Sequence, residues 1–107
     1  MYNPYIGAIF LFAGNFAPAD WAFCHGQLLP ISENETLFNL IGTTYGGDGQ
    51  QTFGLPDFRG RVVVGAGGAK TLGQKNEYPA AAEGTNAQRG LGLNYIICLQ
   101  GVYPTPA

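Results

Sequence analysis

Charge is scarce in this chain of 107 residues. Lysine and arginine number five, aspartate and glutamate seven, and the formal net charge is −2. Binding to DNA or RNA usually requires a strongly basic surface, which so few cations cannot provide. Arg59 and Arg61 form an isolated basic pair that local carboxylates explain better than phosphates do. We therefore expect no nucleic-acid partner.

Histidine occurs only once, as His25, which limits the chemistry available to the chain. One histidine lacks the partners that a metal site or a Ser-His-acid triad needs. The glycine-rich stretch 46–49 lacks the lysine of a phosphate loop and the ligands of a calcium loop. Asp20, Asp48 and Asp57 each lie in a turn context that explains an acid there. We expect no catalytic residue, no metal and no cofactor.

Long hydrophobic runs are missing as well. Residues 6–13 are apolar but too few to span a bilayer, so we expect no membrane insertion. The first residues contain no positive segment of the secretory type, which predicts synthesis in the cytoplasm without a signal peptide. Cys24 and Cys98 are the only cysteines. A disulfide between them is one alternative, but two buried free thiols on facing strands fit a chain without an export signal better.

Glycine and aromatic residues are plentiful by contrast, with 17 glycines, seven phenylalanines and six tyrosines. Many glycines and few charges are typical of a turn-rich β domain that buries much of its surface against other subunits. Most aromatic rings are expected in the core or at subunit interfaces. Tyr45, Tyr78 and Tyr103 fall in loops or in the tail, so they are the candidates for contacts with a ligand such as a glycan.

Apolar patterning predicts an α+β domain, mainly β, with one short helix at about residues 33–41. Ser32 and Glu35 have the spacing of a capping box at the start of this helix, and Gly42 is expected to end it. The last strand is the most apolar and is expected at the centre of the sheet. The expected strands are 6–12, 21–24, 28–31, 62–64 and 93–100.

The segment 53–61, which we call the corner segment, is the most informative stretch. Pro56 is expected to end an extended run, Asp57 to accept hydrogen bonds from nearby backbone N–H groups, and Gly60 to supply a backbone angle that other residues avoid. Asp57 is expected to form a structural ion pair with Arg59 or Arg61. The residues assigned to structure and assembly are Trp21, Pro56, Asp57, Arg59, Gly60 and Arg61.

The order of several short motifs resembles the phage tail collar domain family, including its microcystin-dependent-protein branch. The motifs are 4–7, 12–14, Pro18, 21–24, 26–29 and the corner segment. The resemblance covers about the first two-thirds of the chain, and 93–101 is similar to the closing strand of longer members. It implies a component of a tail fibre or tip, commonly trimeric, in phages or in phage-derived contractile injection systems.

Longer members of that family often carry an insertion with a His-x-His pattern, which in some fibres binds metal on a trimer axis and presents a receptor-binding head. Residues 69–92 are short and contain no histidine, so the resemblance implies a short form without this head. The expected organisation is one domain over 1–107: a collar region at 1–68, a dispensable surface excursion at 69–92 that Tyr78 anchors, and a closing strand and tail at 93–107.

The leading hypothesis is a non-enzymatic, self-assembling structural module, a homotrimer that contacts other tail or injection-system proteins and ends in a virion or extracellular particle. The alternative is a small adhesin that binds cell-surface glycans through its loop tyrosines. An enzyme is the least favoured class, because no catalytic set of residues is visible.

Overall fold

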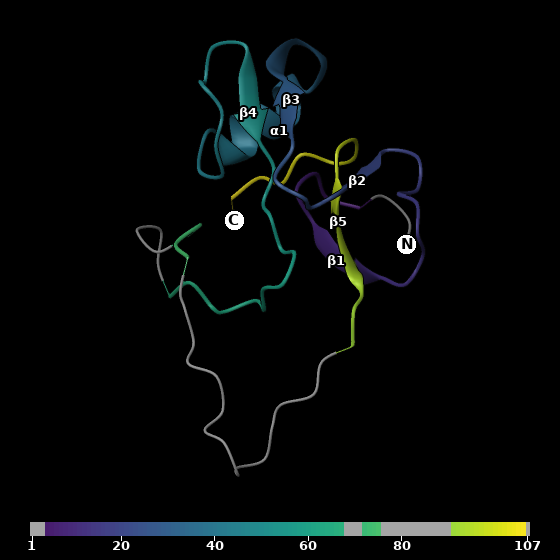
Figure 1. Cartoon of the computed structure of the whole chain (residues 1–107). Coiled ribbons are helices and arrows are strands. Elements are labelled where there is room, and N and C mark those ends of the chain that lie inside the picture. Colours follow the sequence, from purple (N-terminus) through teal and green to yellow (C-terminus); the bar gives the residue numbers. More distant parts are fainter. Residues whose placement is uncertain (1–3, 68–71, 76–90, 107) are drawn as a thin grey trace.

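The computed structural model describes residues 4–67, 72–75 and 91–106. It confirms a small, mainly β domain with one short helix, whose strands form two antiparallel sheets. Figure 1 shows the elements in chain order. They are β1 (Ile9–Phe12), β2 (Trp21–Phe23), β3 (Leu28–Pro30), the 3-10 turn η1 (Ile31–Glu33), α1 (Glu35–Ile41), β4 (Thr52–Gly54) and β5 (Asn94–Cys98).

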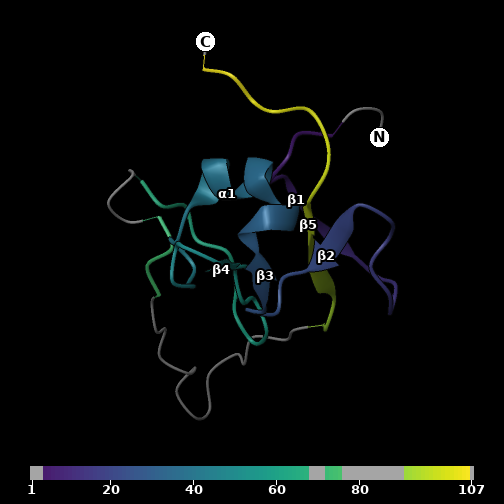
Figure 2. The same ribbon diagram turned by 90° about the horizontal axis from the view of Figure 1, so that it is seen from above.

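The larger sheet has three strands in the order β1-β5-β2, so the last strand of the chain lies between the first two (Figure 2). Ile9 pairs with Ile97 across β1 and β5, and Trp21 pairs with Cys98 across β2 and β5. Ile96, Ile97 and Cys98 are buried in this central strand. The expected central position of the final strand is therefore confirmed, as the continuous apolar run predicted.

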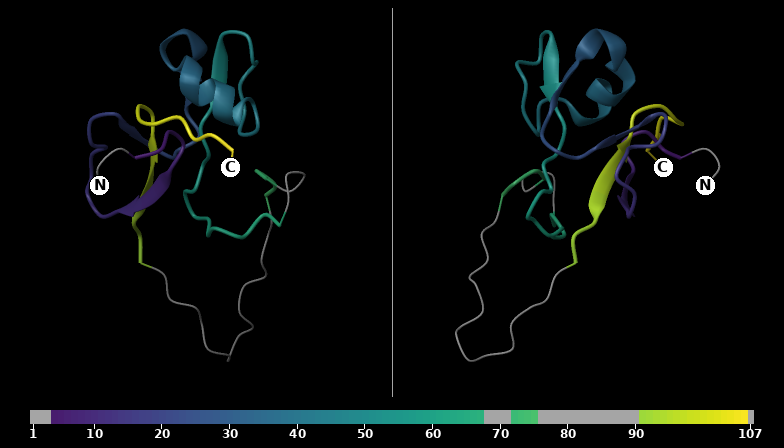
Figure 3. Two further views of the ribbon diagram at one scale, coloured as in Figure 1. Left: turned by 180° about the vertical axis from the view of Figure 1, so that it is seen from behind. Right: turned by 45° about the vertical axis from the view of Figure 1, so that its right-hand side comes forward.

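The smaller sheet pairs β3 with β4 and packs with the helix. Leu29 faces Phe53 across this sheet, and the ring of Phe53 lies 5.5 Å from that of Phe38 on α1. Both views in Figure 3 show the helix (blue) against β3 and β4. The core between the two sheets consists of Ile6, Cys24, Leu37, Phe53, Leu55 and Ile97.

The expected capping box at Ser32 is wrong, because the α-helix begins three residues later. Ser32 lies in η1, the N-cap of α1 is Asn34, and no side chain caps the helix. Residues 31–34 close a tighter turn, in which the N–H of Asn34 donates to the carbonyl of Ile31 over 3.0 Å. The predicted end is confirmed: Gly42 has φ 55° and donates its N–H to the carbonyl of Phe38.

The strand expected at residues 62–64, which we call the valine run, is also wrong. The run has no regular structure, and Val62, Val63 and Val64 are 71%, 58% and 45% exposed. β-Branched residues favour a strand only where a neighbouring strand can pair with them, and none of the described strands pairs with this run. β4 was not among the expected strands, although it lies in the extended run that Pro56 was expected to end.

Both cysteines are free and buried, so the expectation of two buried free thiols is confirmed. The sheet register places Cys98 opposite Trp21, whereas the N–H of Cys24 bonds to the carbonyl of Tyr95, so the two thiols do not face each other. Burial raises the pKa of the Cys24 thiol to about 12. Among the described residues, no helix is long and apolar enough to cross a membrane. Most of the expected excursion 69–92, including Tyr78, lies outside the described residues.

Candidate functional site

Backbone hydrogen bonds tie the corner segment to the turn between β2 and β3. The N–H of Phe58 donates to the carbonyl of Cys24 over 3.0 Å, and the N–H of Gly26 donates to the carbonyl of Pro56 over 3.2 Å. His25 and Asp57 form an isolated antiparallel bridge between these two bonds. The corner segment thus has a fixed position beside the sheet, although it contains little regular structure itself.

The side chains of Asp57 and Arg59 bind each other at this turn. Oδ1 of Asp57 accepts from the backbone N–H and from Nε of Arg59, over 3.1 and 2.9 Å, and Oδ2 accepts from Nη2 over 2.8 Å. These bonds, led by those of the guanidinium, hold the pKa of Asp57 well below its usual range. The ion pair expected here is present, and so are the expected bond to a backbone N–H and the positive φ of 69° at Gly60.

Sequence reasoning missed two residues that support the corner segment. Gly26 has φ 76°, and a Cβ atom there would lie 3.1 Å from Cβ of Asp57, so glycine permits this close approach. Gln27 fastens the turn before it: its amide nitrogen donates to the carbonyl of Phe23, and its amide oxygen accepts from the N–H of His25. In the sequence, the Gly-Gln pair that follows a short strand is the feature that could have indicated this supporting role.

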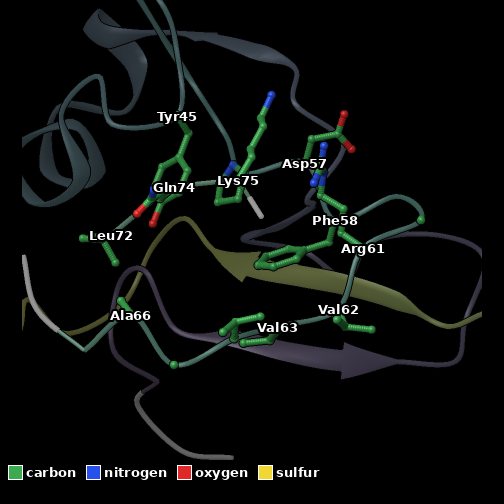
Figure 4. A pocket seen from close by; sticks show the side chains of 15 residues that line it. Tyr45, Asp57, Phe58, Arg61, Val62, Val63, Ala66, Leu72, Gln74 and Lys75 are labelled. Carbon is green, nitrogen blue, oxygen red and sulfur yellow. The ribbon is translucent and has the colours of Figure 1, made fainter. Parts of the chain in front are cut away.

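A cavity of about 570 Å³ opens on one side of the corner segment (Figure 4). Apolar side chains form much of its wall: Tyr45, Phe58, the valine run and Leu72, with Arg61, Gln74 and Lys75 also among the lining residues. Phe58 connects the cavity to the central strand, since its ring packs 4.5 Å from that of Tyr95 on β5. The hydroxyl of Tyr45 has a raised pKa, chiefly because of burial and secondly because of the Cys24 thiol.

The described lining of this cavity carries few groups that titrate near neutral pH. Its one carboxylate, on Asp57, is held by Arg59, and its lining residues include no serine, cysteine or histidine. Across residues 4–67, 72–75 and 91–106, no three histidine, cysteine or acidic side chains are grouped so that they could hold a metal ion. The arrangement offers an apolar surface with cationic side chains in its lining.

The glycine-rich stretch 46–49 has a structural explanation. Oδ1 of Asp48 accepts from the backbone N–H groups of Gln50, Gln51 and Thr52 over 2.9 to 3.0 Å. These bonds, the one from Thr52 foremost, lower the pKa of Asp48 to about 2. Asp48 therefore closes the turn that leads into β4, as its turn context predicted.

Of the three candidate ligand-binding tyrosines, the two that the structure describes do not line the same cavity. Tyr45 lines the cavity, Tyr103 is 42% exposed and is not among the lining residues, and Tyr78 lies outside the described part of the chain. Trp21 is also separate from the cavity: it packs on Phe10, at 5.2 Å between ring centroids. The structure brings together Pro56, Asp57, Gly60 and Arg61 of the residues assigned to assembly.

Comparison with known proteins identifies the class of domain that this geometry represents. The profile of the Phage Tail Collar Domain matches residues 7–63, which contain β1 to β4 and the whole corner segment. The chain therefore belongs to the phage tail collar domain family, and the resemblance seen in the sequence is confirmed.

A particular relative is the short tail fiber protein gp12 of Enterobacteria phage T4. The two sequences are 40% identical over 72 residues, which are 66% of this chain. The chain spans only 14% of the length of that relative. The central strand β5 lies beyond residue 63, so the matched region folds here with a strand from outside it.

Proposed function

We propose that this chain is a non-enzymatic structural module of a phage tail fibre, tip or cap, or of a phage-derived contractile injection system. The observation that carries the proposal is the family match over residues 7–63, which includes the corner segment. In that segment Asp57 and Arg59 bind each other, as residues of a scaffold do. The similarity to a short tail fibre protein supports the assignment to a tail.

The module assembles as a homo-oligomer, and the stoichiometry that we propose is a trimer. Exposed apolar side chains support this part of the proposal, because large apolar patches on soluble proteins mark interaction surfaces. The valine run and Leu72, which is 55% exposed, line the same cavity, so several exposed apolar side chains lie around it. A subunit that covers the cavity would remove this surface from water.

The residues of the corner segment have distinct roles in this proposal. Pro56, Asp57, Arg59 and Gly60 hold the turn that carries the chain into the valine run. Arg61 and Trp21 contribute to contacts between subunits. Residues 1–68 then form the assembly region, 93–107 supply the closing strand and tail, and 69–92 replace the head of longer relatives.

Particles from the source culture test the assignment. Phage or injection particles are purified by density gradient, and peptides of this chain are measured by mass spectrometry beside those of tail-tube and cytosolic proteins. We expect the chain to be enriched together with the tail proteins, and antibodies against it to label the tail end in electron micrographs. Co-enrichment with the cytosolic control, without labelled tails, would contradict the proposal.

A further inference from the structure

The outer edge of β1 is an unprotected strand edge. In the order β1-β5-β2, β5 pairs with one side of β1, and no described strand pairs with the other. Alternate backbone N–H and C=O groups of an antiparallel edge strand point away from its partner. Soluble proteins usually block such edges with charged residues or proline, or cover them. Ile9–Phe12 contains neither, and residues 5–17 contain no charged residue and no proline.

The edges of the other described strands differ from this one. β3 contains Pro30, which cannot donate to a further strand. β2 follows directly after Asp20, an exposed acid with φ 68°. Of the two edge strands of the larger sheet, β1 is therefore the one with neither proline nor charge in it or directly beside it, and its Leu11 is 58% exposed. An edge of this kind needs a cover in the assembled protein.

The valine run has the sequence of a strand but belongs to no sheet of the described residues. Three consecutive β-branched residues strongly favour extended, paired backbone. In the structure they are mostly exposed and belong to no sheet. Such a conflict between local preference and observed setting indicates that the described residues of one subunit do not supply all the contacts of the run.

We propose that the valine run of one subunit adds as a further strand to the free edge of β1 in a neighbouring subunit. Neither segment carries a charge, so pairing places no like charges opposite each other. The contact joins two different segments, so it can repeat from subunit to subunit, and such a heterologous contact forms a ring where the rotation between subunits closes. The inference rests on the proposed self-assembly and specifies its interface.

Own-chain pairing is disfavoured by the path of the backbone. The N–H of Phe58 donates to the carbonyl of Cys24 directly after β2, so the chain reaches this sheet on the side of β2, opposite to the free edge of β1. The valine run begins four residues later and is not paired with β1 of its own chain. The edge of a neighbouring copy is therefore the partner we assign.

Directed cross-linking tests the pairing. Leu11→Cys and Val63→Cys are made in separate chains, mixed by co-expression, oxidised and run on a non-reducing gel, with the wild-type chain as control for its two buried thiols. We expect a linked dimer from the mixture, a ladder up to the closed ring from the double variant, and no dimer from Leu11→Cys alone. Dimers of Leu11→Cys alone would overturn the proposal in favour of β1 pairing with β1. Cross-links confined within single chains would overturn it as well.

A proline variant gives a second measurement. Val63→Pro removes a backbone donor from the run, whereas Val63→Thr keeps both the donor and the branched shape. Leu91→Pro is the matched control, because Leu91 is 87% exposed outside any element. We expect Val63→Pro to weaken association at least tenfold with unchanged far-ultraviolet circular dichroism, and the two other variants to assemble normally. Normal assembly of Val63→Pro would overturn the pairing.

Light scattering on the wild-type chain distinguishes a failure of the proposed self-assembly from a failure of the proposed strand pairing. A monomeric wild type would overturn the proposed self-assembly and the pairing with it. An oligomeric wild type without the expected cross-links would overturn the pairing alone.

Discussion

Replacing Gly47 by alanine should destabilise the fold far more than the same change at Gly60. Both glycines have positive φ, 92° and 69°, in the turns before and after β4. A Cβ atom at Gly47 would overlap Cα of Phe53 and would lie 2.6 Å from the carbonyl oxygen of Thr52. A Cβ atom at Gly60 would meet no atom within 4 Å.

The two substitutions share one energetic term and differ in another. Placing alanine at positive φ costs about 1–2 kcal/mol at either position. At Gly47 the new methyl group also forces apart two backbone segments, and overpacking of this kind adds about 1–3 kcal/mol. Phe53 is fully buried against α1, so it cannot move aside without loss of core contacts. We expect Gly47→Ala to lower the free energy of unfolding by about 2–5 kcal/mol and Gly60→Ala by about 1–2 kcal/mol.

Thermal unfolding of the two variants and the wild type, at one chain concentration, measures this difference. One kcal/mol shifts the melting temperature of a domain of this size by about 4–8 °C, so Gly47→Ala should melt at least about 4 °C below Gly60→Ala. Equal melting temperatures would refute the close approach of the glycine-rich loop to β4.

Three other substitutions test the core and the two structural acids. Leu37→Ala removes a fully buried side chain from the helix and should lower the free energy of unfolding by about 2–5 kcal/mol in urea titration; a loss below about 1 kcal/mol would contradict the core assignment. Arg59→Ala should raise the pKa of Asp57 toward its usual range in a carboxyl NMR titration, and an unchanged pKa would show that the guanidinium does not hold this acid. The folded-state pKa of Asp48 lies below its unfolded value, so its contribution to stability is present above about pH 4 and lost as the pH falls toward 2. Asp48→Asn should therefore flatten the acid dependence of the melting temperature over that window, and a curve parallel to that of the wild type would contradict this role.

The parts of the fold that could be predicted from the sequence carry local chemical signals. Gly42 ends the helix because a residue at positive φ was required there. The turn of Asp57, Arg59 and Gly60 could be predicted from local spacing. An acid two residues before an arginine can accept hydrogen bonds from both the backbone N–H and the guanidinium of that arginine. β5 could be predicted as central from its continuous apolar run.

The parts that failed depend on contacts with distant residues. Ser32 has the right spacing for a cap, but the bond between Ile31 and Gln51 fixes the chain before the helix, so the helix starts later. The valine run has the composition of a strand, yet no described strand of the same chain pairs with it. The cavity was also beyond sequence reasoning, because its wall comes from segments far apart in the chain, around Tyr45, Phe58 and Leu72.

Light scattering on the purified chain tests the central claim of self-assembly most directly. The chain has a mass of 11.3 kDa, and a trimer has three times that mass. We expect the trimer mass across the micromolar range, unchanged in high salt, because the proposed contacts are mainly apolar and backbone contacts, which salt screens little. A monodisperse species of 11.3 kDa under these conditions would contradict the claim.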